Sequence, residues 1–564
     1  MAVAASARAP AQRDPLRTIV VVALWFVLGL FVLYPLACLL VRAFSDDAGF
    51  TFGPIVGALG NPTHLRALRN SIVLATLVGI FGTAAGFLFA FTVERTGMGR
   101  GLRRMIDLVI LLPLISPPFT TSIGFVFSFG PRGLITHGLF GMQNAQVYGW
   151  TSTLTAEALT YFPLAFLALR PLIAAIGGDL EEAAFSLGGS RWQVFRTVTL
   201  PLTLPGIGNA FLLIFAASLA DFATPLILAG NNLPVLPTDA YLQITGMFDL
   251  KGGAVLSLLL LVPAGLVFFA QRYLVERRSY VTITGKIGGR AQGAAAAAWV
   301  RWMLWAICAA VTAFILYLYA LLVYTSVVVA FGANESLTLA NYQVIFTEGI
   351  PAIKDTLIIA LVAMPLGGLY GVIVGYLIAR SRGLGRHMLE IVSMINYALP
   401  GTIVGIAYLI AFNGTPFALT GTATIIIACY IFRYSPTGIR TTVALLQQVD
   451  RSIEEASFSL GAGTLRTFYG VTLPLIMPAF FAGLGTVFIR AMTAISATIF
   501  LVSINWTLIT VRILENMTEV ALGPAAAFSV FVIVVVLLVT SLLNVALRRM
   551  TAPSLHVARL GTAS

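Results

Sequence analysis

The chain has 564 residues, of which 59% are hydrophobic and only 10% are charged, and it carries a formal net charge of +12. Together with a mean hydropathy of +0.94, this composition lies far outside the range of water-soluble domains and excludes a soluble globular fold. The sequence therefore indicates a protein that crosses a membrane many times.

Apolar runs long enough to cross about 30 Å of hydrocarbon, at about 1.5 Å per residue, occur along the whole chain. In chain order they begin near Thr18, Asn70, Met105, Trp150, Gly206, Ala254, Arg301, Asp355, Leu389, Thr420, Ala479 and Gly523. We therefore predict an all-α, polytopic membrane fold of about 12 transmembrane helices, six in each half of the chain.

Arginine and lysine are concentrated at the two ends of the chain and in alternate loops. The basic stretches are residues 8–17, 95–104, 272–290, 380–386 and 548–559. Because short loops rich in Lys and Arg stay on the cytoplasmic side, we predict a multi-pass membrane protein with both termini in the cytoplasm. Contact with anionic lipid headgroups accounts for the net charge, so no nucleic-acid partner is expected.

A glycine-rich stretch between Gly285 and Ala298 is typical of a flexible connector. It divides the chain into a first half, residues 1–290, and a second half, residues 291–564. Since each half has an even number of predicted spans, both halves enter the membrane from the same side. We expect two parallel six-helix halves related by a pseudo-twofold axis along the membrane normal.

One polar segment occurs twice, 273 positions apart, and interrupts an otherwise apolar chain each time. The 25 residues from Glu181 to Pro205 share 14 identities with their second copy, far above the two or three that composition alone would give. We call residues 177–205 the first repeated loop and residues 450–478 the second repeated loop. The sequence predicts one repeated loop on the cytoplasmic side of each half.

Each repeated loop has the pattern of a short amphipathic helix, a glycine turn and a second short helix lying parallel to the membrane. Gly188 and Gly461 are placed to end the first helix, because glycine accepts the left-handed backbone required just past a helix end. In the second copy, Ser452 and Glu455 form the pattern of a capping box.

The loops also resemble a known family. Glu-Ala-Ala, three residues, Gly, nine residues, an aliphatic residue, any residue and Leu-Pro is the signature of type I ABC importer permeases, and both copies fit it, with Ser457 in place of the second alanine. The resemblance implies that each loop is a coupling helix seated on an ATPase subunit. The implied contact residues are Glu182, Ala183, Gly188, Glu455, Ala456 and Gly461. Helix capping and termination alone would explain any one of them taken singly.

The same resemblance implies a location in the bacterial inner (plasma) membrane, and it also implies partners. We expect two ATP-binding subunits, one for each loop, and a periplasmic solute-binding protein. The chain itself shows no phosphate-binding loop, because Gly285-Lys286 is followed by Ile287 and lacks the earlier glycine. We therefore expect no catalytic residues, no cofactor and no enzymatic activity in this polypeptide.

Two charges fall inside predicted spans, where each costs roughly 2.5 to 3.5 kcal/mol on insertion scales. Asp221 lies in the fifth span and Arg490 in the eleventh, and the 273-residue repeat places them one helical turn apart on equivalent helices. We predict that they face one another or a shared aqueous cavity on the substrate path; a buried ion pair without a transport role is the alternative. Arg170, Arg433 and Arg440 lie nearer span ends and are expected to snorkel toward the interface.

Only resemblance to known permeases indicates which substrate the protein transports. The two-half fusion, residues 219–225 and 494–501, and residues 278–286 resemble ferric-iron importer permeases. Permeases for 2-aminoethylphosphonate and for thiamine remain alternatives. The four histidines form no pair with metal-ligand spacing, so no metal site is expected in the chain. An ion-gradient-driven secondary transporter is a further alternative, disfavoured because Asp221 is nearly the only carboxylate predicted within a span.

Overall fold

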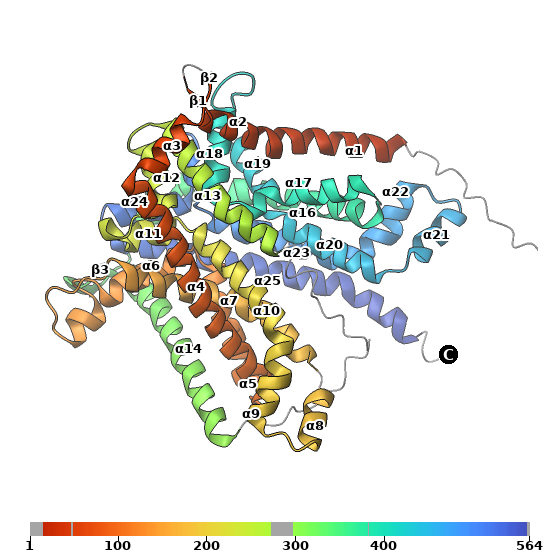
Figure 1. The fold of residues 1–564 in the computed structure, drawn as a ribbon, viewed down its shortest axis with the longest axis horizontal. Coiled ribbons are helices and arrows are strands. Elements are labelled where there is room, and N and C mark those ends of the chain that lie inside the picture. The colour runs from red at the N-terminus through yellow and green to blue at the C-terminus, as the bar shows by residue number, and fades with distance from the viewer. Residues whose placement is uncertain (1–14, 47–48, 177, 272–296, 382, 561–564) are drawn as a thin grey trace, which may run out of the picture.

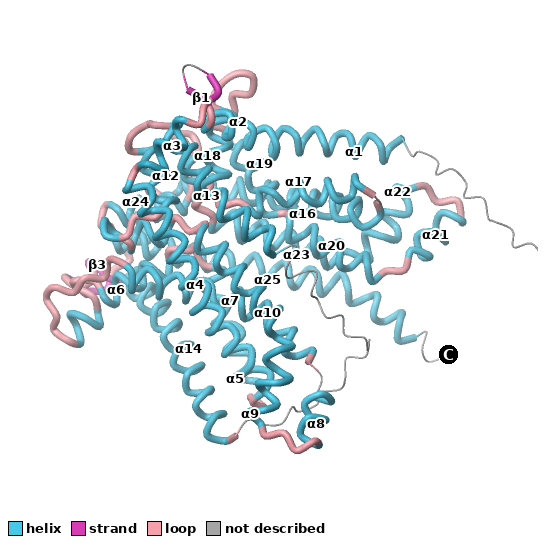
Figure 2. Tube along the Cα trace, in the orientation of Figure 1, coloured by secondary structure: helices cyan, strands magenta, loops and turns pink. Residues whose placement is uncertain are grey.

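The computed structural model describes residues 15–46, 49–176, 178–271, 297–381 and 383–560. These residues are almost entirely helical, with two short antiparallel strand pairs (Figure 2). The predicted all-α membrane fold is confirmed. Most of the predicted connector between the halves, residues 285–296, lies outside the described residues.

The part before the connector (residues 15–271) is called the N-terminal part. Its elements, with π and 3-10 turns labelled η, are α1 (Pro15–Leu28), η1 (Gly29–Leu33), α2 (Tyr34–Ala43), β1 (Ser45–Asp46), β2 (Gly49–Phe50), α3 (Gly53–Gly60), α4 (Pro62–Arg95), α5 (Arg100–Ile115), α6 (Thr120–Phe129), η2 (Leu134–Leu139), α7 (Trp150–Ala175), α8 (Gly178–Ser186), α9 (Arg191–Val194), η3 (Phe195–Thr199), α10 (Leu200–Leu219), α11 (Ala223–Leu228), η4 (Gly230–Asn232), α12 (Leu236–Thr245) and α13 (Leu250–Ala270).

The part after the connector (residues 297–560) is called the C-terminal part. Its elements are α14 (Ala298–Ser326), β3 (Val328–Ala330), β4 (Asn334–Leu337), α15 (Ala340–Thr347), α16 (Ile350–Arg380), α17 (Leu384–Ala398), α18 (Gly401–Phe412), α19 (Ala423–Tyr434), α20 (Pro436–Gln448), α21 (Arg451–Ser459), α22 (Thr464–Thr467), η7 (Phe468–Thr472), α23 (Leu473–Thr493), η8 (Thr498–Phe500), α24 (Ile509–Thr518) and α25 (Leu522–Leu560).

The predicted spans are not all straight helices. Among the described residues, nine helices are long and apolar enough to cross a membrane, or eleven if each of two sharply bent pairs is one span. The bent pairs correspond to the predicted third and ninth spans, with bends of 100° and 103°. The span predicted near Thr420 is built from α19 and α20, which are separated at Ser435 and are each too short to cross alone.

Proline places the two sharp bends at equivalent positions. Ser116 and Leu399 each precede a proline, and both have extended backbone, with ψ of 159° and 145°. A residue before proline avoids the helical region because the proline ring would collide with its backbone. Helices α5 and α17 therefore end inside the protein, where the carbonyl groups of their last turns need other partners.

The two parts interlock rather than standing side by side (Figure 1). Helix α2 packs against α18, and η1 contacts α17 and α19, so the first span of the chain lies on the C-terminal part. In turn α14, the first span of the C-terminal part, packs against α4, α5 and α6. Each part thus covers a flank of the other.

A proline also fixes one of these crossings. Pro35 has no N–H, so it cannot bond the carbonyl of Phe31 four residues earlier. That carbonyl accepts hydrogen bonds from the Tyr408 hydroxyl and from the Asn396 amide, both in the C-terminal part. The Phe31 ring stacks on Phe432, with ring centroids 5.4 Å apart. The Phe31 carbonyl, which Pro35 leaves without a helical partner, thus accepts hydrogen bonds that connect the two parts.

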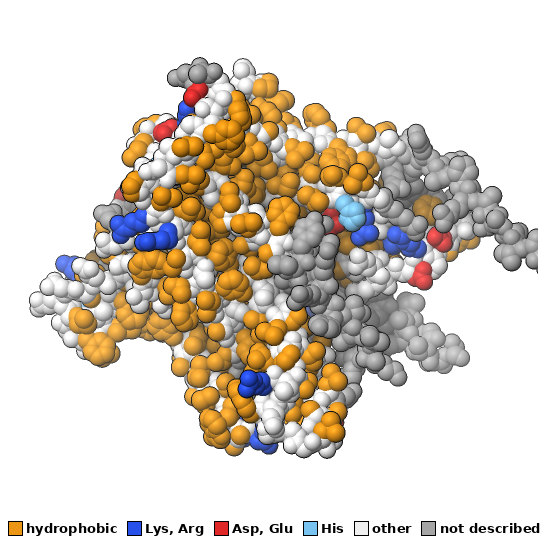
Figure 3. All heavy atoms as spheres, viewed as in Figure 1, with side chains coloured by type: hydrophobic (Ala, Val, Ile, Leu, Met, Phe, Trp, Pro, Cys, Tyr) orange, Lys and Arg blue, Asp and Glu red, His pale blue; other side chains and the backbone are white. Residues whose placement is uncertain are grey.

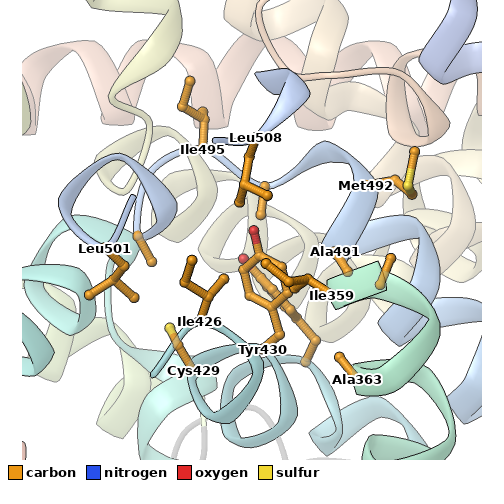
Figure 4. Packing of buried hydrophobic residues seen from close by; sticks show 14 of the residues in the cluster. Ile359, Ala363, Ile426, Cys429, Tyr430, Ala491, Met492, Ile495, Leu501 and Leu508 are labelled. Carbon is orange, nitrogen blue, oxygen red and sulfur yellow. The ribbon is translucent and has the colours of Figure 1, made fainter. Parts of the chain in front are cut away.

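Apolar packing dominates both the interior and the outer face. Figure 4 shows Ile359 of α16, Tyr430 of α19 and Ala491 of α23 in one buried cluster of the C-terminal part. The Tyr430 hydroxyl is satisfied there by Thr498, 2.7 Å away. Hydrophobic side chains cover most of the face shown in Figure 3, as a lipid-facing surface requires.

Close helix contacts in both parts depend on one glycine pattern. Gly79, Gly82 and Gly86 on α4 recur as Gly368, Gly371 and Gly375 on α16. A Cβ on Gly86 would lie 2.4 Å from the Cβ of Ala165 on α7, and one on Gly375 would lie 2.6 Å from the Cβ of Thr442 on α20. Small residues let membrane helices approach this closely.

We predict that Gly86→Ala and Gly375→Ala each destabilise the fold by about 1 to 3 kcal/mol, the usual cost of overpacking. The measurement is the loss of monodisperse protein on heating in detergent. Gly265→Ala in α13 is the matched control, because no other described segment of the chain has an atom within 4 Å of its Cβ position. Equal melting of the Gly86 and Gly265 variants would contradict the packing argument.

Candidate functional site

Both repeated loops form the predicted helix, turn and helix, with α8 and α9 in the first and α21 and α22 in the second. Gly188 and Gly461 have φ of +86° and +84°, so both adopt the left-handed conformation predicted for them. The amide of the following residue then reaches back to the helix, with Gly189 N donating to Ala184 O at 3.0 Å. This is the hydrogen bond of a Schellman turn.

The helix starts differ from the prediction. The capping box predicted at Ser452 and Glu455 is wrong, because Asp450 caps α21 by accepting a bond from Ser452 N at 2.9 Å. That bond also lowers the pKa of Asp450. A capping box does occur in the first loop, where the Ser190 hydroxyl and the Gln193 side chain bond each other's backbone amides at the start of α9.

A buried glutamate ties the first repeated loop to the membrane helices. Glu181 lies 3.2 Å from Arg95, at the end of α4, and accepts a hydrogen bond of 2.8 Å from Thr199, just before α10. Arg95 also donates to the carbonyls of Ile173 and Ile176 at the end of α7. Only 9% of the Arg95 and 8% of the Glu181 side chain are exposed. The Glu181–Arg95 pair thus joins α8 to three membrane helices.

The second repeated loop has the same arrangement. Glu454 lies 2.9 Å from Arg380, at the end of α16, and accepts a bond of 3.0 Å from Thr472, just before α23. Arg380 also donates to the carbonyl of Leu446 in α20. We call each of these Arg–Glu–Thr groups a loop latch. Nothing in the sequence prediction identified them.

The residues predicted to contact an ATPase lie on the opposite, outer side of each loop. Glu182, Ala183 and Gly188 are exposed, as are Glu455, Ala456 and Gly461. Beside them Leu187 and Leu460 are each 89% exposed. Two consecutive glutamates therefore have different placements, since the first is buried in the latch and the second faces outward.

A cavity of about 270 Å³ lies between the two parts. Several of its lining residues are equivalent at the 273-residue offset, such as Tyr161 and Tyr434, and the ends of α10 and α23 both contribute to its wall. The bent spans contribute Ser116 and Leu399, at the two helix breaks. The cavity thus follows the internal repeat of the chain.

Asp221 and Arg490 both line this cavity. They form no ion pair, since no contact of 4 Å or less joins these two described residues. Asp221 is buried and caps α11, with one carboxylate oxygen accepting from the amides of Ala223 and Thr224. Its other oxygen is buried without a hydrogen-bond partner. Arg490 is exposed.

Arg433, one of the three arginines expected to snorkel, does not do so. Arg433 is buried and lines the cavity, where it donates 2.7 Å and 2.8 Å bonds to the carbonyls of Asn396 and Leu399 at the break after α17. Arg440 also lines the cavity. Arg170 instead joins helices α4, α5 and α7 through ion pairs to Glu94 and Asp107. Backbone carbonyls and carboxylates within the protein thus provide the partners of Arg433 and Arg170.

Glu157 on α7 is a carboxylate that the sequence prediction missed. Its side chain is fully buried and accepts a short hydrogen bond from Ser218 on α10. The premise that Asp221 is nearly alone inside the spans is therefore wrong. In the part of the chain that the structure describes, no three His, Cys, Asp or Glu side chains are grouped as metal ligands.

A duplicated helical membrane unit, a cavity between its copies and two exposed loops tied to the membrane helices define a membrane transporter. Residues 82–280 and 367–552 each match the family described as binding-protein-dependent transport system inner membrane component. The chain belongs to this family, that of ABC importer permeases, in its fused two-half form.

Relatives along most of the chain are permeases of the same kind. The chain is 33% identical over 517 residues to the ferric transport system permease protein FbpB of Actinobacillus pleuropneumoniae, covering 90% of this chain and 75% of the relative. It is 34% identical over 485 residues to the putative ferric transport system permease protein FbpB 1 of Haemophilus influenzae, covering 84% and 76%. A solved bacterial alginate ABC importer matches with a TM-score of 0.42 and 19% identity, over 48% of this chain and 98% of that one.

We predict that Glu181→Gln loosens the first repeated loop. The change leaves the buried Arg95 without its counter-charge, and hydrogen bonds to charged groups are worth about 1.5 to 3 kcal/mol. Hydrogen exchange of residues 178–199 should rise by one to two orders of magnitude, while residues 451–472 of the second loop stay unchanged as an internal reference.

Glu515→Gln is the control for this experiment. Glu515 pairs with Arg512 at 3.1 Å, but both side chains are nearly half exposed, and such surface pairs contribute little. Unchanged exchange in the first loop of Glu181→Gln would show that the latch does not hold α8.

Proposed function

We propose that this chain is the membrane permease subunit of an ATP-driven, binding-protein-dependent importer of iron(III). The named cargo of the two ferric permease relatives supports iron, since each is matched over more than four fifths of this chain. The two permease halves would be residues 1–290 and 291–564. The polypeptide would carry no catalytic activity, because ATP hydrolysis would belong to separate subunits.

The single observation that carries the coupling mechanism is the pair of loop latches. Each outer loop surface would receive one ATPase subunit through Glu182, Ala183 and Gly188, or their second-loop equivalents. Because Glu181 joins α8 to the ends of α4 and α7 and to the start of α10, a displacement of the loop would move these helices together. The latch would therefore transmit the ATPase movement without a flexible intermediate.

The helix arrangement supports alternating access. In Figure 1, α4, α7, α10 and α14 run toward α8, while α16, α20 and α25 run toward α21. The two groups converge at the end that carries β1 and β3 and diverge toward the loops (Figures 1 and 2). We assign the loop end to the cytoplasm, together with both termini, and the strand end to the periplasmic binding protein. Closure of paired ATPases would draw the two loops together.

The cavity would form part of the substrate path. Asp221 and Arg490 line it from equivalent helices, which fits the path position proposed for them. Asp221 also has a structural role as the cap of α11, so loss of its side chain would affect the fold of the cavity wall as well as its charge.

The test of cargo is uptake by the reconstituted complex. The chain, its cognate ATPase and its cognate periplasmic binding protein would be placed in liposomes and supplied with labelled iron(III), 2-aminoethylphosphonate or thiamine. We expect iron accumulation that requires both ATP and the binding protein. Accumulation of another cargo would reassign the substrate, and uptake driven by an ion gradient without ATP would remove the ABC mechanism.

We predict that Gly188→Val and Gly461→Val abolish coupled uptake while leaving the fold intact. A side chain in the left-handed conformation costs about 1 to 2 kcal/mol, and no atom of the described residues, apart from the chain neighbours, lies within 4 Å of either Cβ position. The valine would therefore strain the turn and protrude from the loop surface. ATP hydrolysis and uptake, measured together, should become uncoupled.

Gly97→Val is the control that distinguishes the effect of backbone strain from the effect of a blocked docking surface. Gly97 has φ of +67° and equally open surroundings, but it lies outside the repeated loops. Its variant should retain most uptake. Full uptake by the Gly188 and Gly461 double variant would contradict the proposed docking surface.

A further inference from the structure

The cavity between the two parts has an excess of positive charge. Its charged lining residues are Arg433, Arg440, Arg490 and Asp221. In the described part of the chain, no ion pair joins any of the three arginines to a carboxylate. The cavity lining therefore contains three guanidinium groups and one carboxylate.

The single carboxylate does not neutralise this charge. One oxygen of Asp221 is bonded to the backbone amides of Ala223 and Thr224, so it already compensates the start of α11. Arg440 and Arg490 are both exposed side chains on the cavity wall. Behind them, Arg433 has a buried Nε without a hydrogen-bond partner, although its Nη1 is bonded to two carbonyls.

The positive charge is confined to one wall. At the 273-residue offset, Ala217 corresponds to Arg490 and Leu167 corresponds to Arg440. The N-terminal part thus has apolar residues at the positions of Arg490 and Arg440, and an uncharged residue, Thr160, at that of Arg433. The hydroxyl groups of Tyr161, Tyr397 and Tyr434 belong to residues of the same lining, and these groups can donate further hydrogen bonds.

Such a cavity suits an oxyanion and opposes a bare trivalent cation. Guanidinium groups bind carboxylate and phosphate oxygens through paired, charge-assisted hydrogen bonds. Hard cations instead need several carboxylate or other oxygen ligands, and here a single carboxylate stands among three positive charges. Repulsion from the arginines would raise the free energy of an unaccompanied ferric ion in the cavity.

We propose that the cavity is an oxyanion-binding site, and that iron crosses it as a ferric complex whose oxyanion ligands face Arg440 and Arg490. The iron part of this inference rests on the proposed function, whereas the anion site does not. The volume of about 270 Å³ is sufficient for a phosphate ion or a small carboxylate chelate.

The test is equilibrium binding to the purified full-length chain in detergent. The probes are labelled inorganic phosphate, citrate, ferric citrate and lanthanum(III), a soluble hard trivalent cation. We expect saturable binding of the three anionic probes, weakening with added salt, and no competing binding of lanthanum. Arg490→Ala and Arg440→Leu, which copy the residues of the other half, should each weaken anion binding about tenfold or more.

Two further variants complete the experiment. Arg104→Ala removes an exposed arginine outside the cavity and should leave binding unchanged. Arg490→Lys keeps the charge without the planar fork and should restore part of the affinity. Thermal melting confirms that each variant is folded.

Several outcomes would overturn the proposal. They are absence of phosphate and citrate binding by the wild-type chain, anion affinity unchanged in both arginine variants, and lanthanum binding that Asp221→Asn removes. Binding of phosphate and citrate but not of ferric citrate would overturn the ferric-complex step alone. Failure of ATP-dependent iron uptake by the complex would instead count against the proposed function, because anion binding is measured on this chain without its partners.

Discussion

A buried carboxylate at the base of each repeated loop is the contact on which the arrangement depends. Glu181 and Glu454 are each bonded to an arginine at the end of one membrane helix and to a threonine at the start of another. Separating the loop from the helices would leave a buried charge without its partner, which is costly. The loop and the helices therefore move as one body. The neighbouring residues on the outer surface stay free for a second protein.

The loops were predictable because their chemistry is local. A glycine after a short helix and a proline before a long one determine the backbone over a few residues, and repetition of the pattern made both copies visible. The latches were not, because Arg95 and Glu181 are 86 positions apart, and Arg380 and Glu454 are 74 apart. Only packing of α4 on α7 and of α16 on α20 brings these partners together.

The membrane spans show the same division between local and distant causes. The apolar runs predicted where helices occur. The runs that contain Pro117 and Pro400 were each interpreted as one continuous span, although both are broken. The prolines were evidence for the breaks that the structure contains. Glu157 was overlooked because one carboxylate barely changes the hydropathy of a 26-residue helix. The hydrogen bonds from Arg433 to the carbonyls at the end of α17 could not be predicted, because the sequence does not show which helix lies beside Arg433.

The exchange of first spans between the two parts also constrains how the protein is made. The first span, α1 to α2, is translated first, yet the helices that η1 and α2 contact, α17, α18 and α19, are translated several hundred residues later. The surface of α4, α5 and α6 likewise stays uncovered until α14 has entered the bilayer. The first span therefore reaches its final neighbours only after α19 (Ala423–Tyr434) has been inserted, and each part needs helices of the other to complete its packing.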